Sequence, residues 1–256
     1  MKVEFPSGVV DAVLLDIEGT TTPIAFVYEV LFPFARRHLR EHLRNRWSAA
    51  EIRHVIQQLR EEWADDVTRA EAPPPWIEDG AATLSSVAAY VEWLMDRDRK
   101  SRGLKLLQGH IWERGYRSGA LKSEVFADVA PALERWRRLD IAVAVYSSGS
   151  VLAQRLLFEH TVEGDLTPFI LAFFDLEVGV KTSAESYRRI SAALDRPPEH
   201  FLFVSDAVQE LEGASEAGCH ALLCVRPGNP APPPASRFTA IKSLDDIGIA
   251  ARPSDL

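Results

Sequence analysis

The chain of 256 residues lacks most of the features that mark secreted proteins. It has only two cysteines, Cys219 and Cys224, which are too few for a disulfide framework. If residues 219–225 form a strand, the two thiols face opposite sides of a sheet, because they are an odd number of positions apart. We therefore expect buried, free thiols in a reducing compartment, the cytoplasm.

Long hydrophobic runs and strongly basic segments are also missing. No apolar run approaches the roughly 20 residues that a membrane-spanning helix needs. The first residues, MKVEFPSG, have no apolar segment, so we expect no signal peptide. The net charge of -8, from 29 basic and 37 acidic residues, argues against a nucleic-acid-binding surface. We expect a globular protein that binds neither membranes nor nucleic acids.

The hydrophobic pattern changes twice along the chain. Between residues 25 and 118 it predicts helices at 26–46, 48–68, 81–102 and 104–118, the second opened by a capping box of Ser48 and Glu51. After residue 126 helices and strands alternate, which is typical of a parallel sheet. We expect strands at 9–15, 141–146, 201–204 and 221–225, apolar stretches at 169–174 and 238–241, and helices at 129–139, 151–160, 183–194 and 208–217.

The first strand therefore belongs with the C-terminal part of the chain. The predicted fold is α/β, a Rossmann-like parallel sheet with an inserted all-helical domain. We place the α/β core at residues 1–22 and 123–256 and the helical insertion at 23–122. An insertion directly after a strand of such a sheet is well placed to cap the carboxyl end of that strand.

The segment VVDAVLLDIEGTTT, residues 9–22, points to chemistry. Its apolar run is typical of a buried strand and ends at Asp16, and ligands of open α/β sheets bind beyond the carboxyl ends of strands. Asp16 and Glu18 are two residues apart and point roughly the same way. Two carboxylates this close favour a cation between them, and Mg²⁺ suits oxygen ligands. The alternative is a solvated acidic turn.

Two further segments can bind an anion. Ser147 and Ser148 follow the strand at 141–146 and can offer hydroxyl and backbone donors, although serines at this position also cap helices. Lys181 precedes the helix at 183–194 and can neutralise phosphate oxygens, although most single lysines are solvated surface groups.

A second acidic residue lies at the end of another strand. Asp206 follows the strand at 201–204 and can meet Asp16 at a cation. Glu210 lies one helical turn further on and is a candidate for a supporting role, not a direct ligand. The alternative is that Asp206 caps the following helix.

In this order, the four motifs resemble the haloacid dehalogenase-like superfamily of phosphotransferases. Its members carry a nucleophilic Asp and a second acid two residues on, then Ser or Thr, then Lys, then an acidic motif. The segments DIEGTTTPIAFVYEVLFPFA, YSSGSVLAQRLLF, KTSAESYRRI and VRPGN are similar to the enolase-phosphatase family within it, and the similarity covers nearly the whole chain. Glu18 replaces the Asp that most of the superfamily has, a substitution that this family shares.

The resemblance implies a HAD-like core with a helical cap, and an enzyme of L-methionine salvage. Such enzymes convert 2,3-diketo-5-methylthiopentyl-1-phosphate to an acireductone plus phosphate. The resemblance assigns the nucleophile to Asp16, general acid/base catalysis to Glu18, substrate binding to Ser147, Ser148 and Lys181, and one Mg²⁺ per chain to Asp16, the Glu18 backbone carbonyl and Asp206.

Three other functions stay open at this stage. They are a Mg²⁺-dependent phosphatase of the same superfamily acting on sugar phosphates, a dehalogenase, and a non-enzymatic binding module. Trp112 and Tyr116 are candidates for gripping the methylthio end of the substrate, or else pack within the helical domain. The sequence has no signal for oligomeric state, and our expectation is a monomer.

Overall fold

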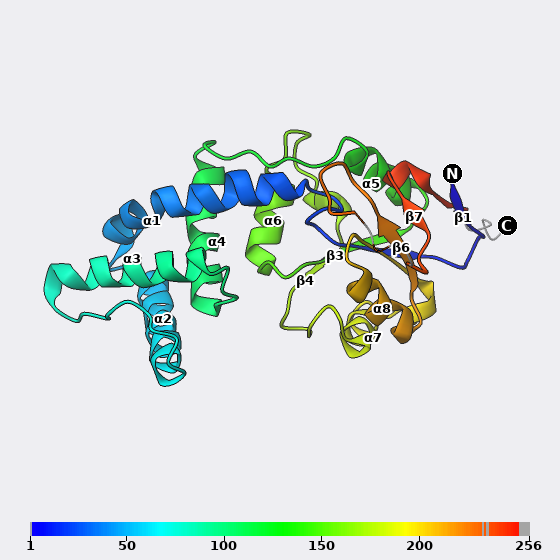
Figure 1. Cartoon of the computed structure of the whole chain (residues 1–256). Coiled ribbons are helices and arrows are strands. Elements are labelled where there is room, and N and C mark those ends of the chain that lie inside the picture. The colour runs from blue at the N-terminus through cyan, green and yellow to red at the C-terminus, as the bar shows by residue number, and fades with distance from the viewer. Residues whose placement is uncertain (1, 232, 234–235, 251–256) are drawn as a thin grey trace. The chain divides into compact units, whose positions relative to one another are not determined.

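The computed structural model describes residues 2–231, 233 and 236–250 and divides into two compact units. One unit consists of Met1–Val27 and Lys122–Leu256, and the other of Tyr28–Leu121. The first contains the strands, and the second is helical (Figure 1). That the helical unit acts as a cap stays a prediction.

A six-stranded parallel sheet lies at the centre of the α/β unit, in the order β4-β3-β2-β5-β6-β7. Its strands are β2 (Ala12–Leu15), β3 (Ala142–Tyr146), β4 (Ala172–Phe174), β5 (Phe201–Ser205), β6 (His220–Cys224) and β7 (Ala240–Ile241). The helices between them are α5 (Val129–Arg138), α6 (Val151–Glu159), α7 (Ala184–Ala193) and α8 (Val208–Ala217). The predicted α/β fold with a parallel sheet is confirmed.

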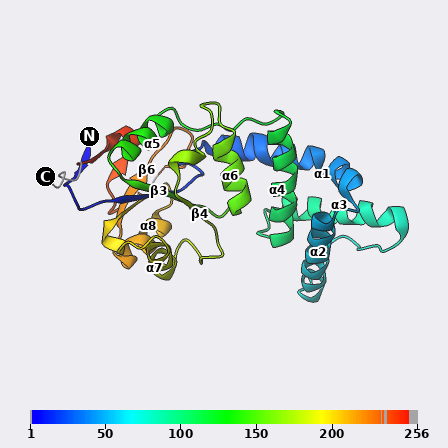
Figure 2. The same ribbon diagram turned by 180° about the vertical axis from the view of Figure 1, so that it is seen from behind.

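Alternating side chains of the strands form two apolar layers, one on each face of the sheet. Val13 and Leu15 of β2 belong to the layer that contains α5 and α6, whereas Leu14 belongs to the layer that contains α7 and α8. Figures 1 and 2 show these helix pairs on opposite faces. Cys224 lies in the first layer and Cys219 in the second, and both thiols are free and buried, as predicted. Burial raises the pKa of both.

The helical unit begins in a π-helical segment, η1 (Phe26–Leu31), and continues with α1 (Phe32–Arg46), α2 (Ala50–Thr68), α3 (Gly80–Asp96) and α4 (Arg102–Arg117). Trp112 and Tyr116 of α4 are both buried. The indole N–H of Trp112 donates to the carbonyl of Leu31 at 2.8 Å, and its ring stacks on Phe32. These contacts within the unit favour the packing alternative for Trp112.

Two predictions about helix ends are wrong. Helix α2 begins after Ala49 and has no side-chain cap, because Ser48 lies one residue outside the capping position and Glu51 pairs with Arg46 instead. The predicted helix at 81–102 ends at Asp96, where Asp98 adopts a left-handed backbone conformation with φ of +46°. Ser101 then caps α4 by accepting a hydrogen bond from the backbone N–H of Leu104.

Two short strands had no sequence signal. β1 (Val3–Phe5) and β8 (Ile247–Ile249) pair in a two-stranded parallel sheet, and three residues are too few to give a clear alternation. Short 3₁₀ turns occur at η2 (Thr167–Phe169), η3 (Pro198–His200) and η4 (Leu244–Asp246). Across the described residues, every helix is too short or too polar to span a bilayer.

Candidate active site

The register of the central strands brings three of the predicted motifs to one edge of the sheet. Leu15, the last residue of β2, is paired with Val145 of β3 on one side and Val204 of β5 on the other. Asp16, the residue after β2, therefore lies beside Tyr146 and Ser205, the last residues of the two neighbouring strands. Its backbone N–H donates to the carbonyl of Val204 at 3.0 Å, which fixes this position.

The Asp16 carboxylate is buried, and both of its oxygens accept hydrogen bonds. The ammonium group of Lys181 lies 2.6 Å from Oδ1, and the hydroxyl of Ser205 lies 3.2 Å from Oδ2. Hydrogen bonds to a charged group are shorter and stronger than those between neutral groups. The nucleophile predicted by the resemblance and the predicted lysine are thus in direct contact.

Lys181 is not the solvated lysine that its sequence context allowed, since its side chain is only 8% exposed. Its Nζ atom lies 2.5 Å from Oε2 of Glu210, in addition to its contact with Asp16. Burial disfavours the charge of Lys181, but Asp16 and Glu210 outweigh that effect and raise the pKa of the amine. A lysine flanked by two carboxylates carries its positive charge throughout the physiological pH range.

Ser205 and Glu210 complete a closed ring of polar contacts with Asp16 and Lys181. The Ser205 hydroxyl, which is fully buried, also lies 2.9 Å from Oε2 of Glu210 and accepts from the backbone N–H of Ala207. A hydroxyl has one proton, so Ser205 donates to Asp16 or to Glu210 at any moment, but not to both. Burial, followed by the charge of Asp16, raises the pKa of Glu210.

From the sequence, Glu210 is only a supporting candidate and Ser205 has no predicted role. The signal for Glu210 was its position one turn into α8, on the helix that follows Asp206. Ser205 had a weaker signal, a hydroxyl as the last residue of an otherwise apolar strand. Tyr187 of α7, which had no signal, has its hydroxyl 2.6 Å from the backbone carbonyl oxygen of Lys181 and 3.0 Å from that of Glu210, and shares its one proton between them.

Ser147 lies at the same sheet edge because it follows β3, next to β2. It is buried, its backbone N–H donates to the carbonyl of Phe174, and its hydroxyl accepts from the N–H of Gly149. Ser148 is half-buried beside it. Ser150, not one of these two, caps α6 by accepting from the N–H of Ala153. The capping alternative for Ser147 and Ser148 is therefore wrong.

The loop that follows Asp16 is tightly organised. The Ile17 carbonyl accepts from the backbone N–H groups of Thr20, Thr21 and Thr22 at 2.9–3.2 Å. Gly19 has φ of +69°, a conformation that favours glycine. A Cβ atom at this position would lie 2.3 Å from Oδ2 of Asp206, so no other residue fits without displacement of that carboxylate. Glu18, half-buried, precedes this glycine.

Asp206 is electrostatically linked to the other acids of the site. Burial raises its pKa to about 6, and the charges of Asp16 and, less strongly, Glu18 act in the same direction. Like charges raise a carboxyl pKa only when they lie near it, so these three acidic residues share one region. The side-chain amide of Asn229 donates to Asp206 Oδ2 at 3.3 Å and to the Gly19 carbonyl at 2.8 Å.

These residues fit a hard divalent cation. Asp16 and Asp206 supply carboxylate oxygens from two adjacent strand ends, β2 and β5. Within the described part of the chain, no three His, Cys, Asp or Glu side chains gather around one point.

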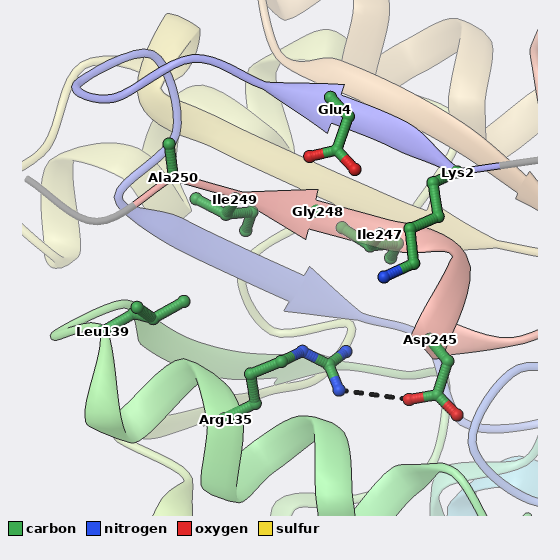
Figure 3. Close-up of a pocket in the computed structure, with 9 residues that line it drawn as sticks. All are labelled: Lys2, Glu4, Arg135, Leu139, Asp245, Ile247, Gly248, Ile249 and Ala250. Carbon is green, nitrogen blue, oxygen red and sulfur yellow. Dashed lines mark hydrogen bonds and ion pairs between the residues drawn. The ribbon is translucent and has the colours of Figure 1, made fainter.

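A separate cavity of about 350 Å³ lies between α5 and the small β1–β8 sheet (Figure 3). Ile247, Ile249 and Leu139 provide its apolar lining. Its charged residues are balanced, with Lys2 and Arg135 against Glu4 and Asp245, and Arg135 pairs with Asp245 at 3.1 Å. None of the predicted site residues lines this cavity.

Comparison with known proteins agrees with the geometry at the sheet edge. The haloacid dehalogenase-like hydrolase family matches this chain over residues 10–218. The protein named Enolase-phosphatase E1 from Synechococcus elongatus is 45% identical over 238 residues, which are 93% of this chain and 98% of the relative. Its namesake from Drosophila erecta is 42% identical over 221 residues, 86% of this chain and 84% of the relative.

A solved structure extends the comparison to the fold. The UTR4 protein (Unknown transcript 4 protein) of Saccharomyces cerevisiae has a TM-score of 0.74 and 30% identity, covering 91% of this chain and 98% of that one. The chain therefore belongs to the enolase-phosphatase E1 family of haloacid dehalogenase-like hydrolases.

Proposed function

We propose that this protein is a bifunctional enolase-phosphatase of L-methionine salvage. It converts 2,3-diketo-5-methylthiopentyl-1-phosphate to an acireductone and inorganic phosphate. The buried pair of Asp16 and Lys181 at the carboxyl end of β2 carries this proposal, in a chain 45% identical to Enolase-phosphatase E1 of Synechococcus elongatus.

In the phosphatase half, the Asp16 carboxylate attacks the phosphorus atom in line. The phosphorus–oxygen bond to the substrate breaks and an aspartyl-phosphate forms. Glu18, as general acid, protonates the leaving oxygen, and then, as general base, takes a proton from the water that hydrolyses the aspartyl-phosphate. The position of Glu18 two residues after Asp16, on a loop held by internal hydrogen bonds, supports this role.

Positive charge and hydrogen-bond donors stabilise the transferring phosphoryl group. Lys181 brings an ammonium group to the attacking carboxylate, and Ser147 supplies a hydroxyl from the adjacent strand end. One Mg²⁺ per chain would be held by Asp16, the Glu18 carbonyl and Asp206, and when bound it would neutralise negative charge on the phosphoryl group. The place of Asp16 and Asp206 at the ends of two neighbouring strands supports this assignment.

In the enolase half, a proton must leave a carbon next to a carbonyl group. We assign hydrogen bonding of the developing enolate oxygen to Ser148, which follows Ser147 at the end of β3. The longer side chain of Glu18, compared with Asp, would suit proton movement at carbon as well as at the leaving oxygen. If Glu18→Asp left both half-reactions at full rate, this second role of Glu18 would be wrong.

A substrate panel tests the function. The protein is mixed with the diketone phosphate and with sugar phosphates, with Mg²⁺ or with a chelator, while enol absorbance and released phosphate are both recorded. We expect both signals from the diketone phosphate, and loss of the phosphate signal with the chelator. Faster phosphate release from a sugar phosphate, with no enol signal from the diketone, would favour a general phosphatase instead.

The oligomeric state and the cellular location are part of the same proposal. The proposal includes a monomer, for which light scattering after size exclusion should give a mass near 28.5 kDa. A cytoplasmic location is supported by the two free, buried thiols.

A further inference from the structure

The turn after β6 is hydrogen-bonded to the loop that follows Asp16. This turn runs from Arg226 to Asn229 and is closed by a hydrogen bond from the Asn229 backbone N–H to the Arg226 carbonyl at 3.1 Å. Arg226 Nε donates to the Thr20 carbonyl at 3.0 Å, and Asn229 Nδ2 donates to the Gly19 carbonyl at 2.8 Å. Two consecutive carbonyls of the loop are thus held by two side chains from one turn.

Asn229 differs from Arg226 in what else it touches. The same Nδ2 atom lies 3.3 Å from Oδ2 of Asp206, so its two N–H bonds serve the Gly19 carbonyl and the Asp206 carboxylate. Arg226 instead donates from Nη1 to Oδ2 of Asp128, at 2.8 Å, and to the carbonyl of Lys242. Only Asn229 of the pair reaches an acidic residue of the proposed cation site.

The orientation of the Asn229 amide is settled by its partners. The Gly19 carbonyl and the Asp206 carboxylate only accept hydrogen bonds, so the NH₂ group must face both of them. The Oδ1 atom is then left buried, with no hydrogen-bond partner within the described residues.

Packing leaves Asp206 little freedom around this amide. A Cβ atom added to Gly19 would lie 2.3 Å from Oδ2 of Asp206 and 2.9 Å from Nδ2 of Asn229. The carboxylate, the amide and the backbone of Gly19 are therefore in mutual contact. The amide N–H donor at 3.3 Å partly offsets the cost of burying the Asp206 carboxylate.

We propose that Asn229 is a positioning residue for the divalent cation: it holds the Asp206 carboxylate against the loop that carries Glu18 and so sets the affinity for Mg²⁺. The inference rests on the proposed function for the identity of the cation. Asn229 touches neither the phosphoryl group nor the attacking oxygen, and acts only through Asp206 and Gly19.

Calorimetric titration with Mg²⁺, in the absence of substrate, tests this proposal. Asn229→Ala should weaken Mg²⁺ binding about tenfold, as expected for loss of one hydrogen bond to a charged group. The Mg²⁺ concentration for half-maximal phosphate release should rise by the same factor, while the substrate KM at saturating Mg²⁺ stays unchanged. Asn45→Ala, at the other asparagine of the chain, which is exposed on α1, should alter neither value.

A second variant keeps the test decisive if Asn229→Ala folds poorly. Asn229→Gln retains the amide but is one methylene longer, so it cannot reproduce the contacts at 2.8 and 3.3 Å together, and its Mg²⁺ affinity should fall in the same direction. If the variants lower the melting temperature but bind Mg²⁺ like the wild type, Asn229 only stabilises the loop after Asp16, and the proposal is wrong. A wild type that binds Mg²⁺ without releasing phosphate would instead refute the proposed function.

Discussion

Lys181 Nζ lies 2.6 Å from Asp16 Oδ1, and both side chains are 8% exposed although they are 165 positions apart in the chain. Breaking a buried pair by removing one partner is far more costly than losing a surface ion pair, because the remaining charge is left uncompensated. If the proposed function is correct, this pair both stabilises the carboxyl end of the sheet and presents a positive charge to the phosphoryl group.

Replacement of Lys181 should affect both catalysis and stability. Lys181→Met removes the charge while keeping most of the side-chain volume, and we expect phosphate release to fall at least ~100-fold because the transition state loses its ammonium partner. The melting temperature should also fall, since Asp16 and Glu210 lose their shared cation. Lys122→Met, at an exposed lysine, is the control and should change neither. Near-normal phosphate release in Lys181→Met would show that this amine does not act on the substrate.

Ser205 should matter through its hydroxyl. Ser205→Ala opens the ring between Asp16 and Glu210, and we expect kcat for phosphate release to fall about tenfold, the effect of one charge-assisted hydrogen bond. Ser205→Thr keeps the hydroxyl and should recover most of that loss, provided that the fully buried position accepts the extra methyl group. Ser48→Ala, at an exposed serine, is the comparison. Equal rates for Ser205→Ala and the wild type would mean that the ring does not position Asp16.

Gly19 and Gly8 form a matched pair for testing the packing around Asp206. Both have positive φ, +69° and +79°, but a Cβ atom at Gly8 meets nothing within 4 Å, whereas one at Gly19 meets Asp206. Gly8→Ala should cost about 1 kcal/mol from backbone strain alone. Gly19→Ala should cost more and should also abolish Mg²⁺-dependent phosphate release, as measured by denaturant unfolding and a phosphate assay. Similar losses of stability and activity in the two variants would contradict the contact with Asp206.

His42 should make the protein less stable in acid. Burial, followed by the nearby His110, Arg114 and Arg46, lowers the pKa of this histidine to about 4, and both of its ring nitrogens lack partners among the described residues. Between pH 6.5 and 4 the unfolded chain binds a proton that the folded chain does not, so stability falls as the pH falls. The loss is at most about 3 kcal/mol, from the size of the shift.

Urea unfolding at several pH values between 4 and 7 measures that loss. His42→Gln should flatten the pH dependence in this window, while His54→Gln, at an exposed histidine of α2, should not. An unchanged pH dependence in His42→Gln would mean that another group is responsible.

Residues at strand ends could be predicted from the sequence, whereas the side-chain contacts that connect them could not. Asp16, Ser147 and Asp206 follow strongly apolar strands, and a parallel sheet must bring such positions to one edge. Lys181 follows no such strand directly: its place just before a helix gave a weak signal for anion binding, to which the family resemblance was added. The contact between Lys181 and Glu210 could not be predicted, because it depends on how α7 and α8 pack, which Tyr187 helps to fix through two backbone carbonyls.

The contacts of Asn229 could not be predicted from the sequence for a different reason. Its partners, Gly19 and Asp206, lie 210 and 23 positions away, and a short polar turn after a strand has no pattern that reveals which loop it will contact. The opposite happened at the predicted capping box of Ser48 and Glu51: the pattern is present, but Ala49 occupies the capping position and Glu51 pairs with Arg46. Local patterns thus identified elements, and tertiary contacts decided which side chains meet.

The most direct test of the central claim compares the wild type with Asp16→Asn on 2,3-diketo-5-methylthiopentyl-1-phosphate in the presence of Mg²⁺, with enol absorbance and phosphate recorded together. The nearly isosteric asparagine should preserve the fold, as a thermal melt can verify. We predict that the wild type produces both signals and that Asp16→Asn releases no phosphate, because an amide cannot form the aspartyl-phosphate. Phosphate release by Asp16→Asn at the wild-type rate would contradict the account.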